Sequence, residues 1–367
     1  MRSPARPVVL LTALVTGLTG LIAGPAAAAA APVVAAPAAA PAVAAAAPVV
    51  TTLPFGNPAD VVSSGDRVFV SGGRDETRIV VTNAAGAVTG TIDGLDGPTD
   101  LQLSNDRRTL YVALPKADAI AAYDTGSLVQ SALYSTGAGT CPAKLAFGGR
   151  YLWFGYGCDT WSGEIGQIDL ARQPATVATR LAGTRFYSPP RLATALRNNK
   201  VLFAGEQDVS PWTGYSYTVG SRGALTQVSQ TDHASVGSDL ADAALDPTGT
   251  TVYTASGSPY NAQSFSMADL TTAGRTYETG PYPNAIELTR DGTRLAAGRN
   301  AAYDPDIYVY DVDGAAVAQF ELGGQYDILQ PGGLSWSPNG RRLYAIAADN
   351  YFFETPAELH VLPIPAA

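Results

Sequence analysis

Residues 334–345 read Leu-Ser-Trp-Ser-Pro-Asn-Gly-Arg-Arg-Leu-Tyr-Ala, which is a short apolar segment, a turn and a second apolar segment. Asn339-Gly340 supplies the left-handed backbone positions that a tight hairpin turn requires. The same arrangement recurs at 101–112, 243–254 and 286–297. Shorter copies cover 61–70, 145–154 and 192–203, which brings the number of predicted hairpins to seven.

A second pattern follows most of these hairpins. An isoleucine or phenylalanine lies four residues before an Asp or Asn, as in Ile79 and Asn83 or Ile120 and Asp124. This pattern indicates a third strand that ends in a turn closed by the Asp or Asn side chain. A fourth strand follows, and the units begin near Pro58, Pro98, Pro142, Pro190, Leu240, Pro283 and Pro331. A four-stranded unit that recurs every 40–50 residues or so predicts an all-β fold, a seven-bladed β-propeller of four-stranded antiparallel blades.

The last unit lacks its fourth strand, because the chain ends soon after 357–362. Residues 48–55 precede the first unit and belong to none. We therefore expect this N-terminal segment to form the outer strand of the last blade, which would leave no sheet edge open.

The repeats resemble those of the YVTN-type and WD-repeat-like β-propellers that are common among secreted bacterial proteins. The resemblance rests on the run Ser-Pro-Asn-Gly-Arg-Arg-Leu-Tyr at 337–344 and on residues 307–314, and it covers the chain from about residue 48 to its end. It implies the fold but no single function, because such propellers include binders, scaffolds, lactonases and lyases.

The N-terminus has the layout of a secretory signal peptide, predicted to span residues 1–31. Arg2 and Arg6 precede an apolar run at 8–23, and small residues follow the break at Gly24-Pro25. An uncleaved membrane anchor is the alternative. Residues 32–47 are mostly Ala, Pro and Val and are expected to form an extended spacer before a propeller domain at 48–367. We expect a secreted, extracellular monomer with no membrane span after cleavage.

The charge of the chain limits the class of partner, and its two cysteines indicate a disulfide. The net charge of −9 disfavours nucleic acid. Export permits oxidation, so the two cysteines, Cys141 and Cys158, are predicted to form a disulfide. A two-residue turn at Gly149-Arg150 would place positions 141 and 158 opposite each other, on a non-hydrogen-bonded pair of the hairpin.

Few residues offer catalytic chemistry, and no cofactor is predicted. Asp60, Asp100 and Asp242 begin three inner strands and form a weak candidate site for a divalent cation in the central channel. They would serve the alternative function, a metal-assisted hydrolase or lactonase. Lys144 occupies the matching place in the third blade and favours a structural role for these acids. A lyase would instead use a loop histidine such as His233.

The loops between the second and third strands are long and rich in aromatic and acidic residues. We expect them to gather on one face and to bind a ligand. The candidate ligand-binding residues are Trp161, Trp212, Tyr260, Tyr303, Tyr351, Asp208, Asp304 and Glu354. The alternative is that these rings fold inward and cover the blade edges. The sequence therefore favours a non-catalytic binding module for an extracellular protein or a cell-wall glycan.

Overall fold

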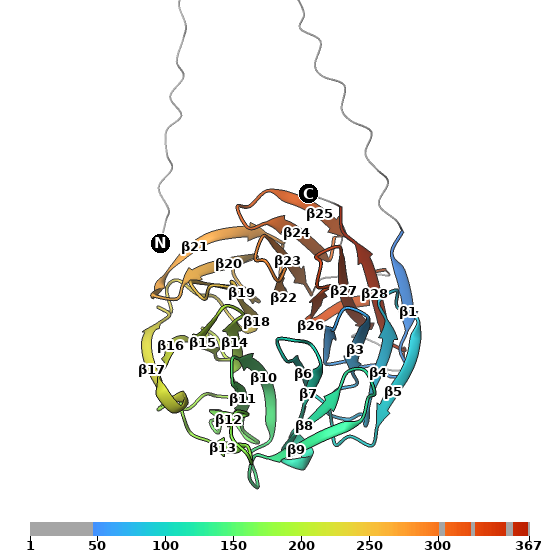
Figure 1. Cartoon of the computed structure of the whole chain (residues 1–367). Helices are drawn as coiled ribbons and strands as arrows, with labels where there is room; N and C mark the ends of the chain where they lie inside the picture. Colours follow the sequence, from blue (N-terminus) through green and yellow to red (C-terminus); the bar gives the residue numbers. More distant parts are fainter. Residues whose placement is uncertain (1–46, 301–304, 324–326, 350–354, 366–367) are drawn as a thin grey trace, which may run out of the picture. The chain divides into compact units, whose positions relative to one another are not determined.

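Seven four-stranded antiparallel sheets form a ring in the computed structural model of this protein (Figure 1). The structure describes residues 47–300, 305–323, 327–349 and 355–365. The predicted signal peptide and nearly all of the predicted spacer lie outside this part of the chain. Apart from two short 3₁₀ turns, η1 (Pro115–Ala117) and η2 (Ser221–Gly223), the regular structure within it is β-strand. The predicted seven-bladed β-propeller is confirmed.

Each blade runs from an inner strand at the channel to an outer strand at the rim. We number the blades one to seven from β2. The inner strands are β2 (Asp60–Ser63), β6 (Asp100–Leu103), β10 (Pro142–Gly148), β14 (Arg191–Ala195), β18 (Leu240–Leu245), β22 (Pro283–Leu288) and β26 (Asp327–Trp336). The second strands are β3 (Arg67–Ser71), β7 (Thr109–Leu114), β11 (Tyr151–Tyr156), β15 (Asn198–Gly205), β19 (Thr251–Ser256), β23 (Arg294–Arg299) and β27 (Arg342–Asp349).

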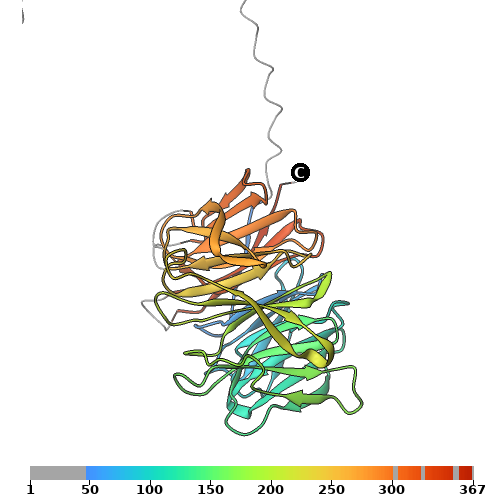
Figure 2. The same ribbon diagram turned by 90° about the vertical axis from the view of Figure 1, so that its left-hand side faces the viewer.

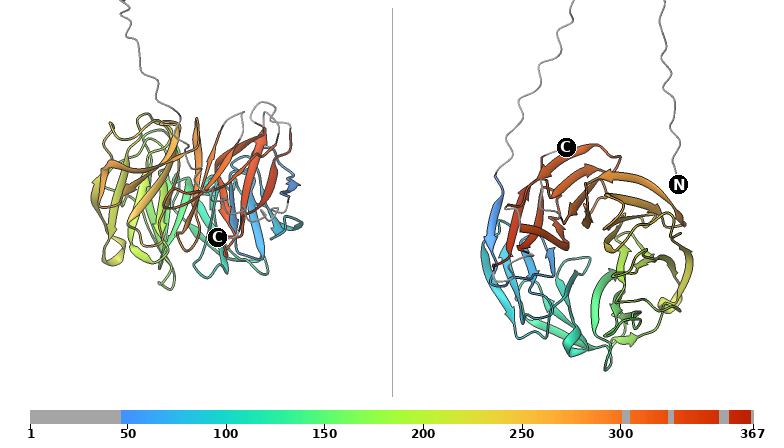
Figure 3. Two further views of the ribbon diagram at one scale, coloured as in Figure 1. Left: turned by 90° about the horizontal axis from the view of Figure 1, so that it is seen from above. Right: turned by 180° about the vertical axis from the view of Figure 1, so that it is seen from behind.

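The third strands are β4 (Arg78–Asn83), β8 (Ala119–Asp124), β12 (Glu164–Asp169), β16 (Gly214–Val219), β20 (Asn261–Ser266), β24 (Ile307–Asp311) and β28 (Glu358–Pro363). The outer strands are β5 (Val88–Asp93), β9 (Gln130–Ser135), β13 (Thr176–Ala178), β17 (Leu225–Gln230), β21 (Asp269–Glu278), β25 (Ala316–Phe320) and β1 (Val49–Thr52). The strands run between two faces of the ring (Figure 2; Figure 3, left).

The two faces carry different connections. We call the face with the turns between first and second strands, and between third and fourth strands, the tight-turn face. The long-loop face carries the connections between second and third strands and the crossings from one blade to the next. Asp and Asn side chains close the tight turns as predicted: Asn83 Oδ1 accepts the N–H groups of Ala85 and Ala87 at 2.9 and 3.0 Å.

The hydrophobic core lies between the blades. Seven clusters of buried apolar side chains fill the seven interfaces between neighbouring blades. Phe203 of blade four, for example, packs with Val252 and Phe265 of blade five. Side chains alternate along a strand, so the two surfaces of each sheet serve two different interfaces. Each blade is therefore stabilised by both of its neighbours.

The N-terminal strand closes the ring as predicted. β1 pairs antiparallel with β28, with Val50 opposite His360. The Leu53 N–H continues the contact by donating to the Ala357 carbonyl at 2.7 Å. Blade seven thus takes one strand from the start of the chain and three from its end.

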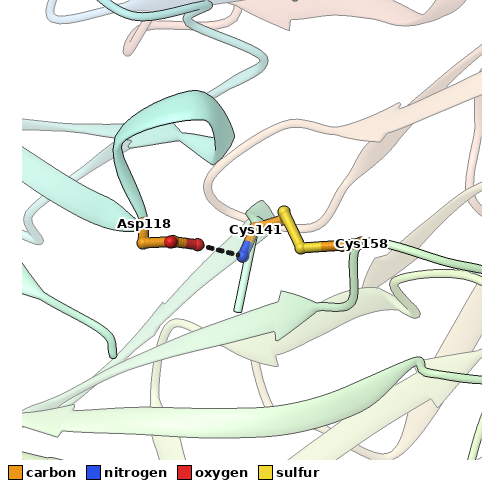
Figure 4. Close-up of side chains that lie close together, drawn as sticks. All are labelled: Asp118, Cys141 and Cys158. Carbon is orange, nitrogen blue, oxygen red and sulfur yellow. Dashed lines mark hydrogen bonds between the residues drawn. A yellow bond between two sulfur atoms is a disulfide. The ribbon is translucent and has the colours of Figure 1, made fainter. Parts of the chain in front are cut away.

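Cys141 and Cys158 form the predicted disulfide, with their Cα atoms 5.2 Å apart. The predicted local geometry was wrong, however. The register expected from a turn at Gly149-Arg150 holds from Gly148 to Lys144 and then shifts by one residue before Pro142. Cys141 therefore lies outside β10, with a left-handed φ of 47°. Its N–H donates to Asp118 Oδ1 at 2.8 Å, which holds this turn against blade two (Figure 4).

No helix in the described residues is long and apolar enough to cross a membrane.

Candidate functional site

The three channel aspartates link neighbouring blades. Each begins the hairpin pattern of its inner strand and accepts a hydrogen bond from the inner strand of the next blade. Asp60 accepts the Leu101 N–H at 2.6 Å. The Leu145 N–H donates to Asp100, and the Ile286 N–H donates to Asp242, both at 2.9 Å. These carboxylates hold the inner strands of five of the seven blades at the channel.

Two basic side chains at matching positions of blades three and four form ion pairs with Asp100 and Asp242. Arg191 Nε lies 3.4 Å from Asp242 Oδ1, and its Nη1 lies 3.9 Å from Asp100 Oδ1. Lys144 Nζ lies 4.0 Å from the same Asp100 oxygen. Burial raises the pKa of Asp100, while Lys144 and Arg191 oppose that rise. A Cβ atom on Gly332 would lie 2.7 Å from Arg191 Nη2, so this side chain crosses the channel from blade four to blade seven.

This geometry favours the structural role of Asp60, Asp100 and Asp242. Their oxygens are engaged by backbone N–H groups, and Arg191 occupies the space between blades. Within the described residues, the carboxylate and thiol groups close enough together to share a metal ion are those of Asp118, Cys141 and Cys158. Because the two sulfur atoms are bonded to each other, they offer no thiolate ligand (Figure 4).

The long-loop face presents two aromatic pairs that share one construction. In each, a ring from a loop between second and third strands meets a ring from the crossing to the next blade. The rings of Trp161 and Tyr187 are 5.4 Å apart at 89°. Those of Tyr260 and Tyr282 are 5.7 Å apart at 66°. Trp161 is 61% exposed, and both rings of the second pair are 54% exposed.

Backbone hydrogen bonds hold the first pair in place. Gly163 and Phe186 exchange both of their hydrogen bonds, at 3.0 and 2.9 Å, and so join the blade-three loop to the crossing. The Trp161 N–H also donates to the Tyr187 carbonyl at 2.7 Å. The two aromatic residues therefore project from two segments that backbone hydrogen bonds hold together.

Sequence reasoning identified Trp161 and Tyr260 but missed Tyr187 and Tyr282. Both missed residues lie just before the prolines that precede or begin an inner strand, in Tyr187-Ser-Pro-Pro and Tyr282-Pro. An aromatic residue at this point of the repeat is the signal that could have found them. Tyr303, Asp304, Tyr351 and Glu354 lie outside the described residues.

The placement of Trp212 on the exposed rim was wrong. Its side chain is 0% exposed and lies in the core between blades four and five, edge-on to Phe265. Gly214 makes room for it, since a Cβ there would lie 2.7 Å from the indole ring. Burial of so large an apolar ring at a blade interface is more favourable than its exposure.

A cleft of about 470 Å³ lies beside the first aromatic pair. Tyr187 and Asp159 line it from one side, Gln207 and Asp208 from the blade-four loop, and Lys144 from the channel. Asp159 and Asp208 are exposed. Asp208, unlike Trp212, therefore lies where a ligand on this face could reach it. The exposed Arg74 lines the cleft as well, so it combines aromatic area, two carboxylates and two basic groups.

His233 does not form the acid–base pair that a lyase would need. Its Nε2 lies 3.2 Å from the Thr213 hydroxyl. Asp232, its neighbour in sequence, instead accepts the Ala234 N–H at 3.1 Å and closes its own turn. The geometry thus gives the lyase interpretation no support.

Comparison with known proteins identifies the fold of this chain but not its function. No protein-family model matches the chain, and no curated protein matches its sequence. A chain in the crystal structure of the mitotic checkpoint complex is similar, with 16% identity and a TM-score of 0.67 over 87% of this chain and 91% of that one. At this identity the likeness shows the fold alone, and that fold is a seven-bladed β-propeller.

Proposed function

We propose that this protein is a secreted, non-catalytic binding module whose long-loop face recognises an extracellular protein. The observation that carries the proposal is the pair of aromatic contacts on this face, Trp161 with Tyr187 and Tyr260 with Tyr282, in which every ring but the half-buried Tyr187 is exposed. Rings exposed beside polar groups are enriched at protein interfaces, where they supply contact area at low entropic cost.

Backbone strain supports a role beyond folding. Trp161 and Tyr282 both have a φ of 60°, in the left-handed region. For a residue with a bulky side chain this conformation costs about 1–2 kcal/mol. Neither ring recovers that cost by burial, because each is more than half exposed. Residues held in such conformations cluster at ligand-binding sites.

The charge of the face indicates the chemistry of the partner. Asp159 and Asp208 are exposed in the cleft beside the first aromatic pair, where Arg74 and Lys144 balance them, and the whole chain is acidic. A partner segment that presents Lys or Arg side chains would complement both the carboxylates and the ring faces. The similar chain belongs to a complex of proteins, which agrees with this class of partner. A cell-wall glycan is the alternative ligand.

The test is retention of extracellular proteins and of cell-wall glycan on the immobilised domain, residues 48–367. The ring-deletion variant combines Trp161→Gly, Tyr187→Ala and Tyr260→Ala, with glycine chosen because it tolerates the left-handed backbone. The matched control combines Val88→Ala, Leu133→Ala and Val228→Ala, which remove exposed apolar side chains from outer strands.

We expect one retained protein, whose binding weakens at least about tenfold in the ring-deletion variant and is unchanged in the control. Its binding should also weaken as salt rises, because exposed charges are screened. Equal binding by wild type and ring-deletion variant would assign the partner to another face. Salt-insensitive retention of glycan that requires the same rings would replace the protein partner with a sugar.

A further inference from the structure

Two arginines face each other across the mouth of the channel on the tight-turn face. Arg107 lies in the turn between β6 and β7 of blade two, and Arg290 lies in the turn between β22 and β23 of blade six. Arg290 Nη2 donates to the Asn105 carbonyl of the blade-two turn at 3.0 Å. Its side chain therefore reaches the turn that carries Arg107, and both arginines line one cavity.

Neither arginine of this pair forms a salt bridge with the described residues. In the described part of the chain, no carboxylate lies within 4.0 Å of either guanidinium group. The nearby turn acids are engaged locally: Asp106 accepts the Ser104 hydroxyl at 2.6 Å, and Asp291 accepts the Thr289 hydroxyl at 2.7 Å. Burial and the charge of Arg290 lower the pKa of Arg107, while Glu287 opposes that fall. Like charges held together in this way favour a bound anion.

A cavity of about 230 Å³ adjoins the pair. Phe147, Leu196 and Trp336 provide apolar wall, and Ser104 and Ser337 add hydroxyl groups near the mouth. Glu287 lines the same cavity. Burial, together with Asp242 and Asp60, raises the pKa of Glu287 to about 8, although Arg191 and Arg107 oppose the rise. At neutral pH this side chain is therefore mostly uncharged and does not neutralise the arginines.

We propose that the tight-turn mouth of the channel binds a small organic anion. Its carboxylate or phosphate group would lie between Arg107 and Arg290, since guanidinium groups bind both anions through paired N–H donors. Its apolar body would enter the channel against Phe147 and Trp336. The site lies on the face opposite the aromatic pairs and does not depend on the protein partner proposed above.

Three probes test this site by isothermal titration calorimetry at low salt: phenyl phosphate, benzoate and inorganic phosphate. We expect saturable binding of phenyl phosphate or benzoate, with one molecule bound per chain, and weaker binding of inorganic phosphate, which lacks the apolar body. Comparison of phenyl phosphate with benzoate decides between a phosphate and a carboxylate ligand. Arg107→Gln and Arg290→Gln should each weaken binding at least about tenfold, because each removes charged hydrogen bonds to the anion.

Arg108→Gln is the matched control, because Arg108 is exposed in the same turn and does not line the cavity. It should leave the affinity unchanged. The milder variant Arg290→Lys keeps the charge and should bind with intermediate affinity. Failure of all three probes to bind the wild type would overturn the proposal. So would unchanged binding in the double variant of Arg107→Gln and Arg290→Gln.

Discussion

Arg191 of blade four and Asp242 of blade five form an ion pair inside the channel, with Nε 3.4 Å from Oδ1. The same guanidinium group reaches Asp100 of blade two and donates to the Ala241 carbonyl at 3.0 Å. One side chain therefore balances aspartates from two blades that are not adjacent. Removal of its charge would leave both acids buried, with Lys144 still paired to Asp100.

Arg191→Gln should lower the free energy of unfolding by about 3–5 kcal/mol, the usual effect of removing one partner of a buried ion pair. Urea denaturation at neutral pH measures it. Arg341→Gln removes an exposed arginine and should change stability by less than about 0.5 kcal/mol. Equal effects of the two substitutions would contradict the bridging role of Arg191.

Glu287 should make stability depend on pH. Burial and the nearby acids raise its pKa in the folded state to about 8, against 4.5 in the unfolded chain. Between these values the folded state holds the proton that the unfolded state has released, so this group's contribution to stability falls as pH rises. Glu287→Gln removes that loss. Thermal melts should show the variant gaining on wild type from pH 5 to pH 8 or so, and a constant difference over that range would contradict the raised pKa.

Truncation of two tryptophans in successive long loops should change stability by very different amounts. Trp212→Ala empties a site in the core between blades four and five and should cost about 3–5 kcal/mol. Trp161→Ala removes an exposed ring and should change stability by less than about 0.5 kcal/mol. Chemical denaturation of the two variants side by side makes the comparison, and similar losses would argue against the exposure of Trp161.

The Cys141–Cys158 disulfide closes a short loop, with a sequence separation of 17. In the chain-entropy description, a bridge of this span stabilises the folded state by about 3 kcal/mol. The double variant Cys141→Ser, Cys158→Ser should lose about that amount in urea denaturation. Thiol titration of the denatured, unreduced wild type should find no free thiol, and two free thiols would rule the bridge out.

Closure of the ring by β1 predicts an abrupt effect of N-terminal truncation. Deletion of residues 1–56 removes β1 and exposes the edge of β28, so the melting temperature should fall markedly. Deletion of residues 1–46 leaves β1 in place and serves as the control. If both truncated proteins melt together, the strand contributes little to closure.

Much of the fold could be predicted because its signals are local. The Pro-Asn-Gly turn at 338–340 and its counterparts mark the hairpins. The last unit lacks one strand and the segment 48–55 belongs to no unit, so this segment was expected to complete blade seven. The disulfide followed from there being two cysteines in the chain. Its local geometry did not follow, because the pairing shifts by one residue between Pro142 and Lys144, as it also does at the start of the inner strands of blades five and six.

The sequence by itself determined the seven blades, their closure and the pairing of the cysteines, because turn residues and alternating apolar residues act over a few positions along the chain. Only the tertiary structure decided that Trp161 faces solvent while Trp212 fills a core, since the two loops differ in the space that the next blade leaves them. It also decided that Arg191 crosses the channel to Gly332 and that Arg107 and Arg290 meet at its mouth. Those contacts join residues of different blades, and ring closure alone brings them within reach of one another.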